Sequence, residues 1–214
     1  MKDDTTQVLP YLFTLFVGGI DLASETTVAR LLDDGNIEVY PAVIGGKPLL
    51  TYRIAAENSY DAVLDAVGRL CCAFPNVQIL RVEPDLVNIT DIAARTGRPR
   101  ETIRAWALGT RGKKDFPLPV SVVGDGIRIW DWTSINSWLR RNELNGYDED
   151  NLLTREEIDE LNVMLVRKLC GNTGKAFQQS RPMSESSTVK LRKPSIIKAA
   201  GVTYPKSVLS GSGA

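Results

Sequence analysis

The chain has 214 residues, 43% of them hydrophobic, with 26 basic and 26 acidic residues and no histidine. This composition is typical of a globular protein with one or two cores. The missing histidine excludes Ser-His-Asp and Cys-His catalysis and histidine-ligated metals, and the three cysteines have neither disulfide-framework nor zinc spacing. We therefore expect no enzymatic activity, no cofactor and no metal.

No stretch approaches the length of a membrane span. The most apolar stretch near the start, residues 12–20, follows a lysine and two aspartates and shows no small-residue cleavage site, so it is a poor signal peptide. We expect a cytoplasmic protein, associated with the nucleoid if it is bacterial or from a phage, with no membrane partner.

The neutral total hides an uneven distribution of charge. Residues 1–85 carry a net −6, residues 86–142 a net +5, residues 143–162 a net −7 and residues 163–214 a net +8. Phosphate attraction is local, because it is screened within about 10 Å. The basic stretches can therefore bind nucleic acid although the whole chain is neutral.

Residues 1–85 predict an α/β domain. Strand patterns at 11–17, 37–43, 49–55 and 77–82 alternate with helix patterns that start near Ser24 and Ser59. The order strand, helix, strand, strand, helix, strand predicts a ferredoxin-like βαββαβ sandwich, so the fold class is α+β. This fold names no function, and a dimerisation platform, a small-molecule sensor and a rigid spacer remain alternatives.

Residues 86–142 predict two short helices that meet at a glycine. Ile89, Ile92 and Ala93 form an apolar stripe, Gly97 suits a reversal of the chain, and Pro99 suits the first turn of a second helix. That helix would bury Ile103 with Trp106 or Ala107. Its other face would then present Arg98, Arg100, Glu101 and Arg104.

A β-hairpin and a third helix follow. The extended entry Phe116-Pro117-Leu118-Pro119 leads to a strand at 120–123, the turn Gly124-Asp125-Gly126 and a strand at 127–130. A closing helix from Asp131 would bury the apolar face formed by Trp132, Ile135, Trp138 and Leu139. The tryptophans lie at apolar-face positions, which favours core packing over base stacking.

This order of elements, with "DFPLPV", a glycine turn, "RIW" and "SWL", resembles the winged helix-turn-helix of the MerR and excisionase (AlpA-type) superfamily. The resemblance covers about residues 86–142 and implies that the second helix enters the DNA major groove. It assigns Arg98, Arg100, Glu101 and Arg104 to that helix and Arg128 to the wing. The loop with Arg111, Lys113 and Lys114 departs from the family pattern and would add phosphate contacts.

Other interpretations of these charged residues remain open. The basic face, to which Arg95 also belongs by spacing, could be merely solvated. Glu101 could accept from a cytosine amino group, or it could orient Arg98 or Arg104 by an ion pair.

The C-terminal part predicts one helix and a tail. Residues 143–171 form an acidic linker and an amphipathic helix, with a capping box at Thr154 and Glu157 and a stripe of Ile158, Leu161, Leu165 and Leu169. This helix would dock on its own chain or pair with a second copy. Residues 172–214 are expected to be disordered, with a basic tail at 190–206.

The leading hypothesis is a sequence-specific double-stranded DNA-binding protein, a transcriptional regulator that acts as a homodimer. One alternative is an excisionase-like architectural factor that bends DNA, and another is a protein-interaction module that no longer binds DNA. Nothing in the sequence indicates a small-molecule effector.

Overall fold

The structure is a computed structural model that describes residues 10–33, 37–110, 114–172, 197–199 and 202–204. It is a mixed α+β protein, as predicted. The described helices include none that is both long and apolar enough to cross a membrane. The expectations for Arg111 and Lys113 fall outside the described residues.

The N-terminal body is an antiparallel sheet with the strand order β2-β3-β1-β4. Side-chain caps begin its two helices. Ser24 accepts from the Thr27 amide, as predicted, and Asn58, which the sequence analysis did not single out, accepts from the Asp61 amide. The core lies between sheet and helices, where Leu15, Val17 and Leu50 are fully buried. The elements are β1 (Pro10–Gly18), α1 (Glu25–Leu32), β2 (Glu38–Ile44), β3 (Lys47–Ala55), α2 (Ser59–Ala73) and β4 (Gln78–Glu83).

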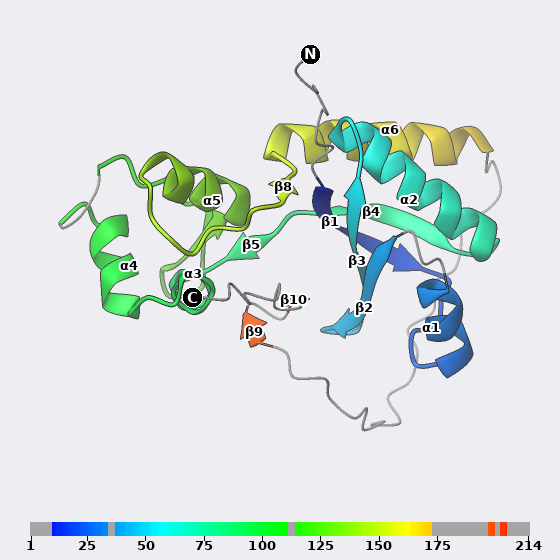
Figure 1. The fold of residues 1–214 in the computed structure, drawn as a ribbon, viewed down its shortest axis with the longest axis horizontal. Helices are drawn as coiled ribbons and strands as arrows, with labels where there is room; N and C mark the ends of the chain where they lie inside the picture. The colour runs from blue at the N-terminus through cyan, green and yellow to red at the C-terminus, as the bar shows by residue number, and fades with distance from the viewer. Residues whose placement is uncertain (1–9, 34–36, 111–113, 173–196, 200–201, 205–214) are drawn as a thin grey trace, which may run out of the picture.

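The second body follows β4 after two residues and has its own core. Its three strands are ordered β5-β7-β6, and its three helices lie beside them at the left of Figure 1. Four tryptophans fill the core, as predicted, and the rings of Trp106 and Trp138 are 5.1 Å apart. The elements are β5 (Leu86–Val87), α3 (Ile89–Thr96), α4 (Arg100–Ala107), β6 (Ser121–Val123), β7 (Ile127–Asp131) and α5 (Trp132–Arg141).

The chain then returns to the first body. β8 (Asn151–Leu152) pairs in parallel with the start of β1, and α6 (Arg155–Asn172) runs beside α2 (Figure 1). The predicted capping box is present, because Thr154 and Glu157 exchange hydrogen bonds of 2.7 and 3.3 Å.

Helix α6 docks on its own chain. Ile158, Leu161 and Leu165 belong to the core of the N-terminal sheet. The amide of Asn162 accepts from the Val82 N–H at 2.7 Å and donates to the Val82 carbonyl at 3.1 Å. It thus occupies the open edge of β4, where a further strand would otherwise pair.

Two short strands lie in the segment that we expected to lack regular structure. β9 (Ile197–Ala199) and β10 (Val202–Tyr204) pair antiparallel. The expectation does not hold for these six residues, which include the β-branched or aromatic residues Ile197, Val202, Thr203 and Tyr204. The rest of 173–214 lies outside the described residues.

Candidate nucleic-acid interface

The helix pair is fixed at its turn. Asn88 and Asp91 form a capping box at the start of α3, and Gly97 ends that helix with φ +65°, a conformation that favours glycine. Pro99 is the N-cap of α4 rather than its first helical residue, which shifts the predicted start by one position. Ile103 is completely buried and Trp106 is 8% exposed, so this side of α4 is held against the core.

The outer side of α4 carries exposed charges. Arg100, Glu101 and Arg104 are all exposed, and none of these side chains forms an ion pair with another described residue. The ion pair that could have oriented Arg104 through Glu101 is therefore not among the described contacts. Because Arg100 and Arg104 are four residues apart, they lie one helical turn from each other on the same face. α4 lies at the end of the molecule farthest from the N-terminal sheet (Figure 1).

Arg95, on α3, is not part of this exposed face. Its guanidinium donates to both carboxylate oxygens of Asp85, at 2.5 and 2.8 Å, and lies 4.7 Å from the centre of the Trp132 ring. Only 8% of its side chain is exposed. The helical spacing that groups Arg95 with the other arginines does not reveal this buried ion pair, so its inclusion in the basic face is corrected.

Arg98 is held at the turn between the helices. Its guanidinium lies 5.2 Å from the centre of the Trp106 ring and donates to the Asn145 carbonyl at 3.3 Å. The side chain is half-buried, unlike those of Arg100 and Arg104. The structure therefore separates Arg98 from the two exposed arginines with which the sequence groups it.

The acidic stretch after α5, which we call the return segment (residues 143–150), packs against the second body. Its Asp148 accepts from the Trp132 indole N–H at 2.5 Å, and the Asp148 N–H donates to the Asn136 side chain at 2.7 Å. Gly146 lies directly against α3, where an added Cβ would be 2.7 Å from the Thr96 Cα. The predicted linker is thus a packed part of the second body.

The return segment also joins the two bodies. Asp150 accepts from the Arg53 guanidinium of β3 in a bidentate ion pair, with distances of 2.9 to 3.0 Å. Beyond the return segment, between β8 and α6, the Leu153 carbonyl accepts from the Thr133 hydroxyl of α5 at 2.8 Å. These contacts fix the helix pair relative to the N-terminal sheet.

Two carboxyl groups of the second body have raised pKa values. Burial raises the pKa of Asp148, against the opposing effect of the Trp132 hydrogen bond. Burial also raises the pKa of Asp131, which accepts from the Ser134 N–H and caps α5. Both groups support the frame of the second body and lie outside the exposed face of α4.

The hairpin tip is more apolar than we expect for a wing that contacts DNA through Arg128. Arg128 is exposed, but Val122, Val123 and Ile127 beside it are 59%, 47% and 54% exposed. Lys114 is also exposed, while its backbone carbonyl accepts from the Trp138 indole at 3.1 Å. The two cations are therefore available to a ligand, but the exposed hairpin side chains Val122, Val123 and Ile127 carry no charge.

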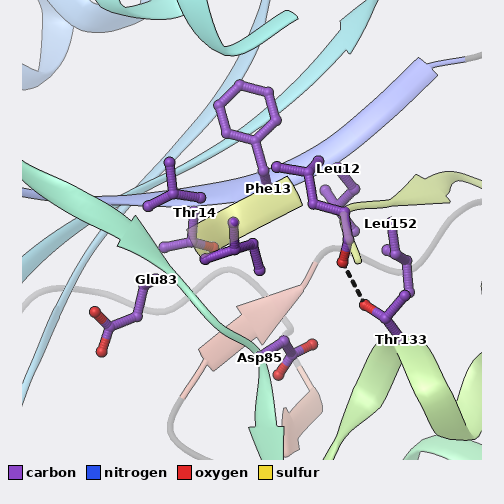
Figure 2. A pocket seen from close by; sticks show the side chains of 10 residues that line it. Leu12, Phe13, Thr14, Glu83, Asp85, Thr133 and Leu152 are labelled. Atoms are coloured by element: carbon purple, nitrogen blue, oxygen red, sulfur yellow. Dashed lines mark hydrogen bonds between the residues drawn. The ribbon is translucent and has the colours of Figure 1, made fainter. Parts of the chain in front are cut away.

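A cavity at the joint is too small for an effector. It has a volume of about 30 Å³, and Figure 2 shows Leu12, Phe13 and Thr14 on one side and Thr133 on the other. This space holds about one water molecule, whereas ligand pockets usually measure about 300 to 1,000 Å³. In the described part of the chain, no group of three potential ligand side chains could hold a metal ion.

Comparison of the chain with protein-family models, with curated proteins and with solved structures returns no match. The interpretation of the site therefore rests on the geometry and chemistry of the residues themselves.

Proposed function

We propose that this protein binds double-stranded DNA in a sequence-specific manner and acts as a transcriptional regulator. The observation that carries the proposal is the pair Arg100 and Arg104, exposed one turn apart on a helix whose other side is anchored by Ile103 and Trp106. The succession of α3, the Gly97 turn, α4, the hairpin and α5 supports a winged helix-turn-helix of the MerR and AlpA type.

The N-terminal body fits a ferredoxin-like domain in this proposal. Its strand order and antiparallel pairing are those expected for a βαββαβ sandwich. It would act as a rigid support, because its contacts through Asp150 and Thr133 hold the helix pair in place.

The proposed contacts divide by chemistry. The guanidinium groups of Arg100 and Arg104 match the two acceptors of a guanine edge in the major groove, and Glu101 can accept from a cytosine amino group. Arg128 and Lys114 would bind phosphates, which positions the protein without reading the sequence. Arg98 would support the turn of the helix pair.

The direct experiment is selection of a binding site from random double-stranded DNA with the full chain. Arg100→Ala and Arg104→Ala should each weaken binding to the selected site by about 1 to 3 kcal/mol and leave the unfolding free energy unchanged. The control is Arg69→Ala, which removes an exposed arginine of α2 and should bind as wild type. Equal affinity of all three variants and wild type would refute the assignment of α4.

A second function is favoured by the hairpin tip. Val122, Val123 and Ile127 are exposed apolar side chains, and proteins that bend DNA use such side chains as wedges between base steps in the minor groove. An excisionase-like architectural factor would therefore bend its selected site. A circular-permutation gel tests this, because a bent complex migrates more slowly when the site lies at the centre of the DNA fragment than when it lies at an end. The double variant Val123→Ser/Ile127→Ser should abolish this difference in migration.

Salt dependence separates both DNA functions from a protein-interaction module. A protein that binds DNA phosphates through lysine and arginine releases counterions from the DNA. Its DNA affinity therefore falls steeply between low and physiological salt. A complex whose affinity is independent of salt would favour a protein partner.

A further inference from the structure

Helix α6 is apolar on two sides, and only one side is used by the N-terminal core. Ile158, Leu161 and Leu165 are buried against the sheet. Val163 and Val166 point elsewhere and remain 50% and 55% exposed. A surface helix normally needs a single apolar stripe, so these two exposed valines are available for a further contact.

A shallow groove of about 500 Å³ runs along this second side. It is mainly apolar at its floor, with charged residues at both ends. The lining residues are Asp159, Glu160, Val163, Met164 and Arg167.

Two of the three charged residues of the groove, Asp159 and Arg167, are placed symmetrically about Val163, and the third, Glu160, accepts from the Tyr60 hydroxyl of α2. Asp159 lies four residues before Val163, and Arg167 lies four residues after it. A two-fold axis through Val163 would therefore place Asp159 of each α6 opposite Arg167 of the other, antiparallel α6. Two identical pairs would result. Such reciprocal contacts are the defining property of an isologous interface.

We propose that this face of α6 binds α6 of a second copy of the chain, antiparallel and centred on Val163. Val163 of one copy would pack against Val163 of the other, and the two Asp159–Arg167 pairs would flank this contact and set the register. In the single chain, Asp159 is bound by Arg155 at 3.3 Å, an exposed pair of little stability that the intermolecular pair can replace.

The helix is rigidly mounted for this contact. Glu157 accepts from the Ser59 hydroxyl at 2.5 Å, Glu160 accepts from the Tyr60 hydroxyl, and Asn162 is bound to β4. These contacts hold α6 against α2 and β4 and leave Val163 exposed. The inference rests on α6 alone and does not depend on DNA binding.

The interface is small, which sets the expected affinity. Eighteen residues make a helix about 27 Å long, so a single helix pair falls below the roughly 800 Å² per partner of a standard interface. We expect a weak dimer with a dissociation constant on the order of micromolar.

Sedimentation velocity of the full chain over a concentration series tests the proposal. Wild type should change from monomer to dimer, and Val163→Glu should weaken the dimer at least tenfold. Leu32→Glu, which changes a similarly exposed leucine of α1, is the matched control and should dimerise as wild type. Circular dichroism checks that each variant is folded.

Charge exchange tests the register. Asp159→Arg and Arg167→Asp should each weaken the dimer, because like charges then face each other, and the double variant should restore it. Failure of the double variant to restore the dimer would overturn the antiparallel register. A monomer up to about 100 µM, or a dimer that Val163→Glu leaves intact, would overturn the proposal. A monomer that Val163→Glu destabilises would assign the face to another segment of the same chain and would also overturn it.

Discussion

The helix pair has two edges that carry the same residue type in different states. At the inner edge, Arg95 is paired with Asp85 and Arg98 is held by Trp106 and Asn145. At the outer edge, Arg100 and Arg104 are exposed and make no ion pair within the described residues. The inner arginines support the frame, and the outer ones are available to a ligand.

The difference arises from partners that are distant or on other elements. Asp85 precedes the helix pair, Trp132 begins α5, and Asn145 lies in the return segment. Arginine content and helical spacing alone cannot distinguish a guanidinium that is already bound from one that is free. The variants below test this distinction, in decreasing order of the change that we expect.

Loss of the Arg95 charge should have the largest effect. Arg95→Met removes the largely buried guanidinium that binds both carboxylate oxygens of Asp85, which should lower the unfolding free energy by about 3 to 5 kcal/mol. Urea unfolding followed by tryptophan fluorescence measures it. Arg69→Met removes an exposed ion pair and should cost less than about 1 kcal/mol. Equal costs for both variants would contradict the inner role of Arg95.

The return segment should tolerate no side chain at Gly146. An alanine Cβ would lie 2.7 Å from the Thr96 Cα, and the φ of +95° adds backbone strain, so Gly146→Ala should cost about 1 to 3 kcal/mol. Gly45→Ala is the control, because Gly45 also has a positive φ but no atom within 4 Å of its added Cβ. The difference between the losses of unfolding free energy in the two variants measures the clash at Gly146. Equal losses would mean that the return segment is not packed against α3.

Arg98→Ala should show whether Arg98 contributes to the stability of the second body or to DNA binding. It removes the contact with Trp106 and one hydrogen bond, for an expected loss of about 1 kcal/mol in unfolding free energy. Its effect on DNA affinity should be smaller than that of Arg104→Ala, which is measured by fluorescence anisotropy. Weakened DNA binding with unchanged stability would instead place Arg98 in the interface.

The smallest effect concerns pH. Because the pKa of Asp148 is raised in the folded state, its neutral form is favoured there, and stability is lost as the pH rises from about 4 through the raised pKa. Asp148→Asn keeps an acceptor for the Trp132 indole and removes this titration. The variant should therefore lose less stability than wild type as the pH rises over this range. The same pH dependence of the unfolding free energy in both proteins would exclude a raised pKa of Asp148.

Local patterns predicted most elements and the tryptophan core. Apolar spacing located α5 with its buried Trp132 and Trp138, and the Thr154–Glu157 capping box located the start of α6. The sequence left open whether α6 docks on its own chain, because an apolar stripe does not name its partner. The bond of Asn162 to the edge of β4 and the two-residue strand β8 have no local signal, since each is defined by residues about 80 or more positions away.

The site was predicted in part for the same reason. Helical periodicity gave the exposure of Arg100, Glu101 and Arg104. It could not give the burial of Arg95 or the position of the return segment, whose acidic composition is typical of a solvated linker.

The most direct test of the account compares the outer and inner edges on one DNA. The affinity of wild type, the double variant Arg100→Ala/Arg104→Ala and Arg98→Ala should be measured for the same selected site at several salt concentrations. We expect the double variant to lose specific binding and to keep its unfolding free energy, while Arg98→Ala retains most of its affinity. A double variant that binds the selected site as tightly as wild type would contradict this expectation.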